Sequence, residues 1–113
     1  MTTKSEQDHL DRIHAMPCIA CVLDGYTTQC GKTEAHHLVD KGYRKHSGGH
    51  FATLPLGAWH HRGEPLSGYT KSQMGLIFGP SFAVSKRQFV GKYGTERDLL
   101  KRVEAMLTRK AVA

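Results

Sequence analysis

Two histidine doublets, His36-His37 and His60-His61, stand out in this chain of 113 residues and hold half of its 8 histidines. Imidazole is the commonest metal ligand and the side chain that most readily acts as a base near neutral pH. Adjacent residues of a strand point to opposite faces, and adjacent residues of a helix lie about 100° apart. Neither doublet therefore easily aims both rings at one metal ion. The pattern predicts a division of labour within each doublet, or one ligand beside an ordinary surface histidine.

Upstream of both doublets lies a Cys18-x-x-Cys21 pair. Two thiolates at this spacing can form one edge of a tetrahedral zinc site, which needs two further ligands. Cys30 and either His60 or His61 are the candidates. Buried cysteines that act as small hydrophobic residues are one alternative. A redox pair is another, although no strand-helix-strand pattern surrounds the cysteines.

The composition agrees with a small domain that gains from a structural metal. Hydrophobic residues make up 39% of the chain and aromatic residues 8%, which indicates a thin core. The number of cysteines, 3, is odd, which argues against a closed disulfide framework. The N-terminus has no apolar stretch typical of a signal peptide, and no run is long enough to span a membrane. We therefore expect a cytoplasmic protein.

The net charge of +6 favours a polyanionic partner, above all nucleic acid. A well-solvated basic surface is the alternative reading of the same charge. Contacts to phosphates carry little sequence information and depend strongly on salt. The candidates for DNA binding are Lys41, Arg44, Lys45, Arg62, Lys86 and Arg87, with Lys92 as a possible extension.

The first half of the chain must position these residues with short elements. We expect a helix over 5–16, with Ser5 as its N-cap and Asp8 as the capping-box partner. A knuckle and loop follow over 18–33. Strands are expected over 34–39 and 51–56, joined by a loop over 40–50, and Pro55 places the second strand at an edge or its own position at a strand end.

The second half is predicted to be helical. A short helix begins at the segment GAWHHR and is broken by Gly63, and another covers 70–78 after the cap Thr70. A third covers 84–93. The last, over 95–109, begins with a Thr95–Asp98 capping box and carries an apolar face. We expect a single domain over 1–113, with the knuckle and strands in 17–64 and the helical part in 70–110.

A strand ending in a histidine doublet, a loop, a strand ending in LPL and a helix with a second doublet resemble the HNH, or ββα-metal, nuclease motif. The resemblance implies an α+β fold with a ββα-metal core, a zinc knuckle and flanking helices. It implies that His37 is the general base and that His36 and His61 bind a catalytic Mg²⁺ or Mn²⁺ ion. The structural Zn²⁺ would then be held by Cys18, Cys21, Cys30 and His60, beside this core.

The segments MPCIAC, EAHHL, GGHFATLPL, AWHHR and KYGTE, in this order, are more closely similar to the phage Ref-type recombination nucleases. Together they span roughly residues 16–100. The resemblance implies a DNA endonuclease with little sequence specificity that acts in phage recombination together with RecA filaments. We expect it to work as a monomer.

Two features depart from the HNH pattern. Gly57 stands where many HNH domains carry a zinc-binding cysteine, so Cys30 would have to compensate. The chain contains no Asn, the residue that names the motif, and His50 would take over its role of orienting the base. The missing Asn favours an alternative function, a non-catalytic zinc module that binds DNA or a recombination protein. The presence of His37 favours the enzyme.

Overall fold

A computed structural model describes residues 2–26, 28–42 and 44–112, without the side chains of 44 and 109–112. Its centre is an antiparallel pair of strands, β1 (Thr33–His37) and β2 (Thr53–Gly57), followed directly by the short helix α4 (Ala58–Arg62). The protein is therefore a small α+β structure with two antiparallel strands and several helices, as the sequence predicts in outline.

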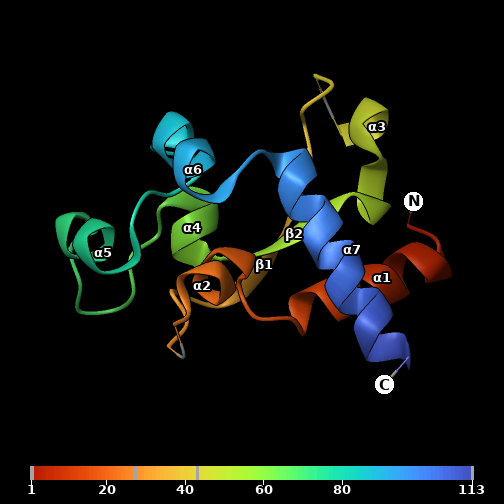
Figure 1. Ribbon diagram of the computed structural model, residues 1–113, viewed down its shortest axis with the longest axis horizontal. Coiled ribbons are helices and arrows are strands. Elements are labelled where there is room, and N and C mark those ends of the chain that lie inside the picture. Colours follow the sequence, from red (N-terminus) through yellow and green to blue (C-terminus); the bar gives the residue numbers. More distant parts are fainter. Residues whose placement is uncertain (1, 27, 43, 113) are drawn as a thin grey trace.

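Helices surround this pair of strands on both sides (Figure 1). In Figure 1, α5 and α6 gather around α4 at one end of the molecule, whereas α7 and α1 cross the strands at the other end. The elements besides β1, β2 and α4 are α1 (Lys4–His14), α2 (Ile19–Asp24), α3 (Arg44–Ser47), the 3-10 turn η1 (Gly49–Phe51), α5 (Lys71–Phe78), α6 (Lys86–Tyr93) and α7 (Glu96–Val112).

The strand β2 forms the centre of the core. All five of its residues are buried, because α1, α2, α4 and α7 pack against it. In β1 His36 is the one buried residue, and the others are half-buried. This asymmetry leaves β1 with access to solvent next to a rigid partner strand. Pro55 is tolerated because β2 has no second partner strand within the described residues.

The first helix begins earlier than expected and uses another cap. The predicted N-cap Ser5, with Asp8 as its partner, is wrong. The side chain of Thr3 accepts a hydrogen bond from the backbone N–H of Glu6, and the Glu6 carboxylate accepts one from the N–H of Thr3. A Thr-x-x-Glu box satisfies both amides, because the longer Glu side chain reaches back to the cap. The helix ends at His14 rather than at residue 16.

Two segments predicted as loops contain helices. The six residues of α2 lie inside the predicted knuckle and loop over 18–33, and Gly25 ends them in a left-handed conformation with φ of 77°. Ile19, Ala20 and Cys21 are all buried, so this helix shows no alternation of polar and apolar faces. The predicted loop over 40–50 contains α3 and η1, which are too short to leave a periodic pattern.

The helices of the second half are confirmed with shifts of one to three residues at their ends. Thr70 caps α5 in a reciprocal box with Gln73. The N–H of Asp98 donates to the Thr95 hydroxyl and the N–H of Thr95 to the Asp98 carboxylate, both at 3.1 Å, which caps α7. The face of α7 that packs on the core carries the buried side chains of Leu99, Leu100, Val103 and Leu107, with Met106 partly buried beside them.

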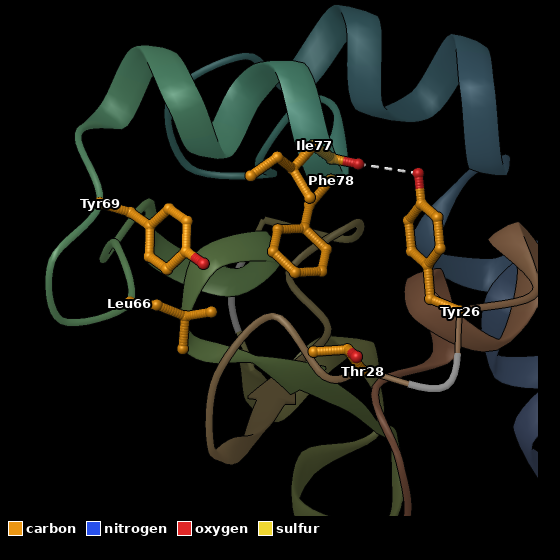
Figure 2. Close-up of a pocket in the computed structure, with 6 residues that line it drawn as sticks. All are labelled: Tyr26, Thr28, Leu66, Tyr69, Ile77 and Phe78. Atoms are coloured by element: carbon orange, nitrogen blue, oxygen red, sulfur yellow. Dashed lines mark hydrogen bonds between the residues drawn. The ribbon is translucent and has the colours of Figure 1, made fainter.

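An aromatic pocket separates α5 from the segment that follows α2 (Figure 2). The hydroxyl of Tyr26 donates to the carbonyl oxygen of Ile77 at 2.8 Å, and its ring meets that of Phe78 edge-on. Leu66 and Tyr69 form the opposite wall. None of the candidate site residues lines this pocket. No helix in the described ranges is long and apolar enough to cross a membrane.

The first turn of α7 anchors the segment between the strands. Arg97 donates two hydrogen bonds to the carboxylate of Asp40, at 2.9 and 2.8 Å, and a third to the carbonyl oxygen of Ser47. The buried hydroxyl of Ser47 in turn accepts from the N–H of Lys41. The hydrogen bonds from Arg97 hold the pKa of Asp40 below its usual range. The basic segment between β1 and β2 is therefore held by hydrogen bonds to α7, the helix whose apolar face packs on the core.

We expect Arg97→Ala to release this segment without unfolding the protein. The backbone amide of Lys41 should exchange with solvent at least about tenfold faster. The reason is that the segment loses the hydrogen bonds from Arg97 to Asp40 and to Ser47, which oppose its local opening. The midpoint of thermal unfolding should fall by less than about 4 °C, because the ion pair lies at the surface. Hydrogen exchange read by mass spectrometry checks this, with the exposed Arg102→Ala of the same helix as control. Unchanged exchange at Lys41 would refute the anchor.

Candidate metal centre and adjoining histidine pairs

Three cysteines and one histidine meet in the core. Cys18, Cys21, Cys30 and His60 are all buried, and their ligand atoms lie within 4.8 Å of one another. The Nδ1 atom of His60 is 3.4, 3.8 and 3.0 Å from the three sulfur atoms. Zn–S bonds of about 2.3 Å and Zn–N bonds of about 2.0 Å in a tetrahedron separate ligand atoms by about 3.5–3.8 Å. The cluster therefore fits a structural zinc ion.

The surroundings of His60 prepare it as a ligand. Its Nε2–H donates to the carbonyl oxygen of Phe78 at 2.9 Å, which leaves Nδ1 as the donor atom for a metal. Hydrogen bonds from Cys21 and Cys30 hold the pKa of Cys18 well below its usual range. A thiolate is the form of cysteine that binds zinc. The hydrogen bond to Phe78 thus favours the tautomer of His60 that can ligate a metal through Nδ1.

Cys30 occupies the space that a side chain at position 57 would fill. A Cβ atom added at Gly57 would lie 2.5 Å from the sulfur of Cys30. The backbone of Gly57 has φ of −62°, which any residue can adopt, so the requirement for glycine is one of space. The sulfur of Cys30 and a side chain at position 57 could therefore not both occupy this space.

The second doublet is divided between two environments. His60 belongs to the cysteine cluster, whereas His61 contacts the carboxylate of Glu34 through Nδ1 at 2.7 Å. Arg62 binds the same carboxylate at 3.0 Å. Burial alone would raise the pKa of Glu34, but the hydrogen bonds from His61 and Arg62 together lower it. Burial lowers the pKa of His61 and outweighs the opposing effect of Glu34.

The first doublet is divided as well. The ring of His36 is buried between that of His61, at a centroid distance of 5.1 Å, and that of Phe82, at 4.7 Å. Its Nε2 atom lies 2.6 Å from the carboxylate of Glu96, the first residue of α7. The next residue along β1, His37, faces the other way. Its Nε2 atom is 2.8 Å from Nδ1 of His50, the residue predicted to orient it.

The cationic candidates for DNA binding differ in their surroundings. Lys86 lies over the ring of Phe82 at 5.3 Å, and Arg62 lies beside His61 on the carboxylate of Glu34. Lys41, Lys45 and Arg87 are exposed. The side chain of Arg44 lies outside the described residues. Lys92 forms an ion pair with Asp24 at 3.3 Å, so its charge already has a partner within the protein.

Glu34, Glu96 and Phe82 contact the two candidate histidines, and sequence reasoning assigned a role to none of them. Glu34 carried a usable signal, because it stands two residues before His36 and so shares a face of the strand. Glu96 belongs to the KYGTE segment, but its position in the sequence gives no indication that it reaches a residue 60 positions away. Phe82 lies in a segment between helices with no periodic pattern.

Removal of the metal ligand Cys18 should destabilise the protein. Cys18→Ser is expected to lose bound zinc and to lower the midpoint of thermal unfolding by at least about 5 °C, because zinc binding contributes directly to folding. Metal analysis and thermal melts check this. The control is Val22→Ser on the same helix, where the side chain is 39% exposed. Full zinc content in Cys18→Ser would contradict the assignment.

The compensation between positions 30 and 57 can be reversed. Cys30→Ala should lose zinc, and Cys30→Ala combined with Gly57→Cys should regain it, because the new sulfur enters the vacated space. Combining Cys30→Ala with Gly57→Ser supplies a control of equal size that lacks the thiolate. Zinc content measured after dialysis distinguishes the three proteins. If the double variant with Gly57→Cys stays free of zinc, the two positions are not interchangeable.

Comparison with known proteins relates this geometry to one family. No curated protein and no solved structure matches the chain significantly. A family model described as recombination enhancement, RecA-dependent nuclease, matches residues 2–108, a range that includes the cysteine cluster and both pairs of histidines. The chain therefore belongs to the family of RecA-dependent nucleases that enhance recombination.

Proposed function

We propose that this protein is a metal-dependent DNA endonuclease of the ββα-metal (HNH) type. It hydrolyses phosphodiester bonds with little sequence specificity, in phage recombination and on DNA that carries a RecA filament. The observation that carries the proposal is the division of the two doublets. His36 and His61 pack against each other on one side of β1, while His37 contacts His50 on the other. A zinc module with a purely structural role needs none of these four rings.

His36 and His61 are the proposed ligands of a catalytic Mg²⁺ or Mn²⁺ ion. Each ring has one nitrogen engaged by a carboxylate and keeps the other as a donor. Two protein donors suit ions that retain several positions for water and phosphate oxygens. When bound, the ion would stabilise negative charge on the phosphate and on the leaving oxygen. The roles of the two histidines are to hold the ion and to align it with the scissile bond.

His37 is the proposed general base. An imidazole near its ordinary pKa can accept a proton from water at neutral pH, provided that one of its nitrogens is oriented by a partner. The 2.8 Å contact with His50 supports this role, and it replaces the orienting contact that an Asn makes in the motif. His37 is half-buried at the end of β1, so water can reach this region.

Substrate binding is proposed to rest on phosphate contacts. Arg62 is held beside His61 because both contact the carboxylate of Glu34. Lys86 lies over the ring of Phe82, which also contacts His36. The exposed Lys41, Lys45 and Arg87 are further proposed phosphate contacts. Such contacts bind the backbone of DNA with little regard for sequence.

The test is nicking of plasmid DNA by the wild type and by His37→Ala, with Mg²⁺, Mn²⁺ or a chelator and with or without a RecA filament. Loss of a general base lowers the rate by about 10²- to 10⁴-fold. We expect a loss on this scale in His37→Ala, together with unchanged zinc content and an unchanged circular dichroism spectrum. We also expect no nicking in chelator and faster nicking with the filament.

The control is His14→Ala, which removes an exposed imidazole from α1. It should nick DNA at the wild-type rate. Nicking by His37→Ala at the wild-type rate would exclude His37 as the base. Absence of nicking by the wild type under all metal and filament conditions would favour the non-catalytic zinc module.

A further inference from the structure

The carboxylate of Glu96 is one of the few buried charged groups of the molecule. It is 6% exposed, comes from the first residue of α7 and lies 2.6 Å from Nε2 of His36, itself 7% exposed. Burial of a carboxylate is costly unless a partner compensates for the lost water. Because burial of this pair is costly, and the two residues are 60 positions apart, we look for a role of Glu96 other than stabilising α7.

The contact has a counterpart on the neighbouring histidine. Glu34 lies 2.7 Å from Nδ1 of His61, and the rings of His36 and His61 pack edge to face. The two carboxylates engage different ring atoms, Nε2 in His36 and Nδ1 in His61. A neutral imidazole has one N–H donor and one acceptor, whereas a carboxylate accepts only. Each carboxylate therefore selects one tautomer of its histidine.

We propose that Glu96 is a positioning residue that sets His36 as a metal donor through Nδ1, with Glu34 setting His61 as a donor through Nε2. The inference rests on the proposed metal-dependent function and names the parts of the chain that prepare the site. A carboxylate behind a ligating histidine fixes the ring orientation and strengthens the donor nitrogen. The ring of Phe82, 4.7 Å from that of His36, restricts the plane of the same imidazole.

Glu96 acts behind His36 rather than as a ligand itself. Its carboxylate lies 2.6 Å from Nε2 of His36, so this contact engages Nε2 and leaves Nδ1 as the nitrogen that can bind a metal. The short contact therefore matches a carboxylate that orients a ligand, and this role accounts for the KYGTE segment, to which the nuclease mechanism otherwise assigns no part.

The first experiment reads the tautomers in the unmodified, zinc-loaded protein. Long-range ¹H–¹⁵N correlation spectra at pH 8 should show the proton of His36 on Nε2 and that of His61 on Nδ1. On addition of Mg²⁺, which is diamagnetic, Nδ1 of His36 should shift while Nε2 keeps its proton. A proton on Nδ1 of His36 overturns the proposal. So does loss of the Nε2 proton on addition of Mg²⁺, because Glu96 and Nε2 would then both bind the ion.

The second experiment measures Mn²⁺ binding by the zinc-loaded protein with calorimetry. Glu96→Gln should weaken binding about 10- to 100-fold, the range typical of a lost carboxylate behind a ligating histidine. Glu104→Gln, an exposed change on the same helix, should leave the affinity unchanged. Zinc content and circular dichroism identify a variant that fails to fold, in which case the tautomer measurement on the wild type decides. Wild-type affinity in a folded Glu96→Gln overturns the proposal.

Neither readout depends on cleavage of DNA. Expected tautomers and Mn²⁺ affinities in a protein that does not nick DNA would remove the proposed function and leave the metal site. A nuclease with the opposite tautomer at His36 would remove the role of Glu96 and leave the function.

Discussion

The attachment of α4 to the cysteine cluster determines where the other candidate residues can lie. A helix of five residues is far below the length of about 12–15 that is marginally stable alone. His60 fixes it, because its ring is completely buried among the sulfur atoms and donates to the carbonyl oxygen of Phe78. A zinc ion in this cluster would join α2, Cys30 and α4 into one unit, which a thin core needs.

Once α4 is fixed, helical geometry directs His61 away from the cluster. The next residue of a helix lies about 100° further around its axis, so the two rings of this doublet cannot share one ion. His61 turns towards β1, where Glu34 and His36 share a face. The pleat of β1 sends His37 to the opposite face, towards His50. The helical period and the pleat of the strand thus place the four imidazoles of the two doublets in three environments.

The helix α7 completes this arrangement from the far end of the sequence. Its first turn supplies Glu96 to His36 and Arg97 to the segment between the strands. Its apolar face packs against β2, which gives that turn a rigid support. The Thr95–Asp98 capping box defines the residue at which the helix begins. The basic segment and the buried histidine are therefore held by neighbouring residues of one element.

Local patterns were sufficient for those parts of the protein that depend on local physics. The caps Thr70 and Thr95, the apolar face of α7 and the splitting of both doublets follow from spacing along the chain, as does the Cys18-x-x-Cys21 pair as one edge of a zinc site. The sequence misplaced the cap of α1, because Ser5 and Thr3 both begin a plausible box. It also missed α2, because a short helix buried on several sides leaves no amphipathic pattern.

Only the tertiary structure decided which distant side chains meet. Cys30 completes the cluster because Gly57, which lacks a Cβ atom, leaves it the space. Glu96 reaches His36 because α7 packs across the strands. These contacts join residues far apart in the chain, and their geometry depends on packing rather than on any periodicity. The sequence by itself thus determined the ligand types and the direction of each histidine, whereas the fold decided their partners.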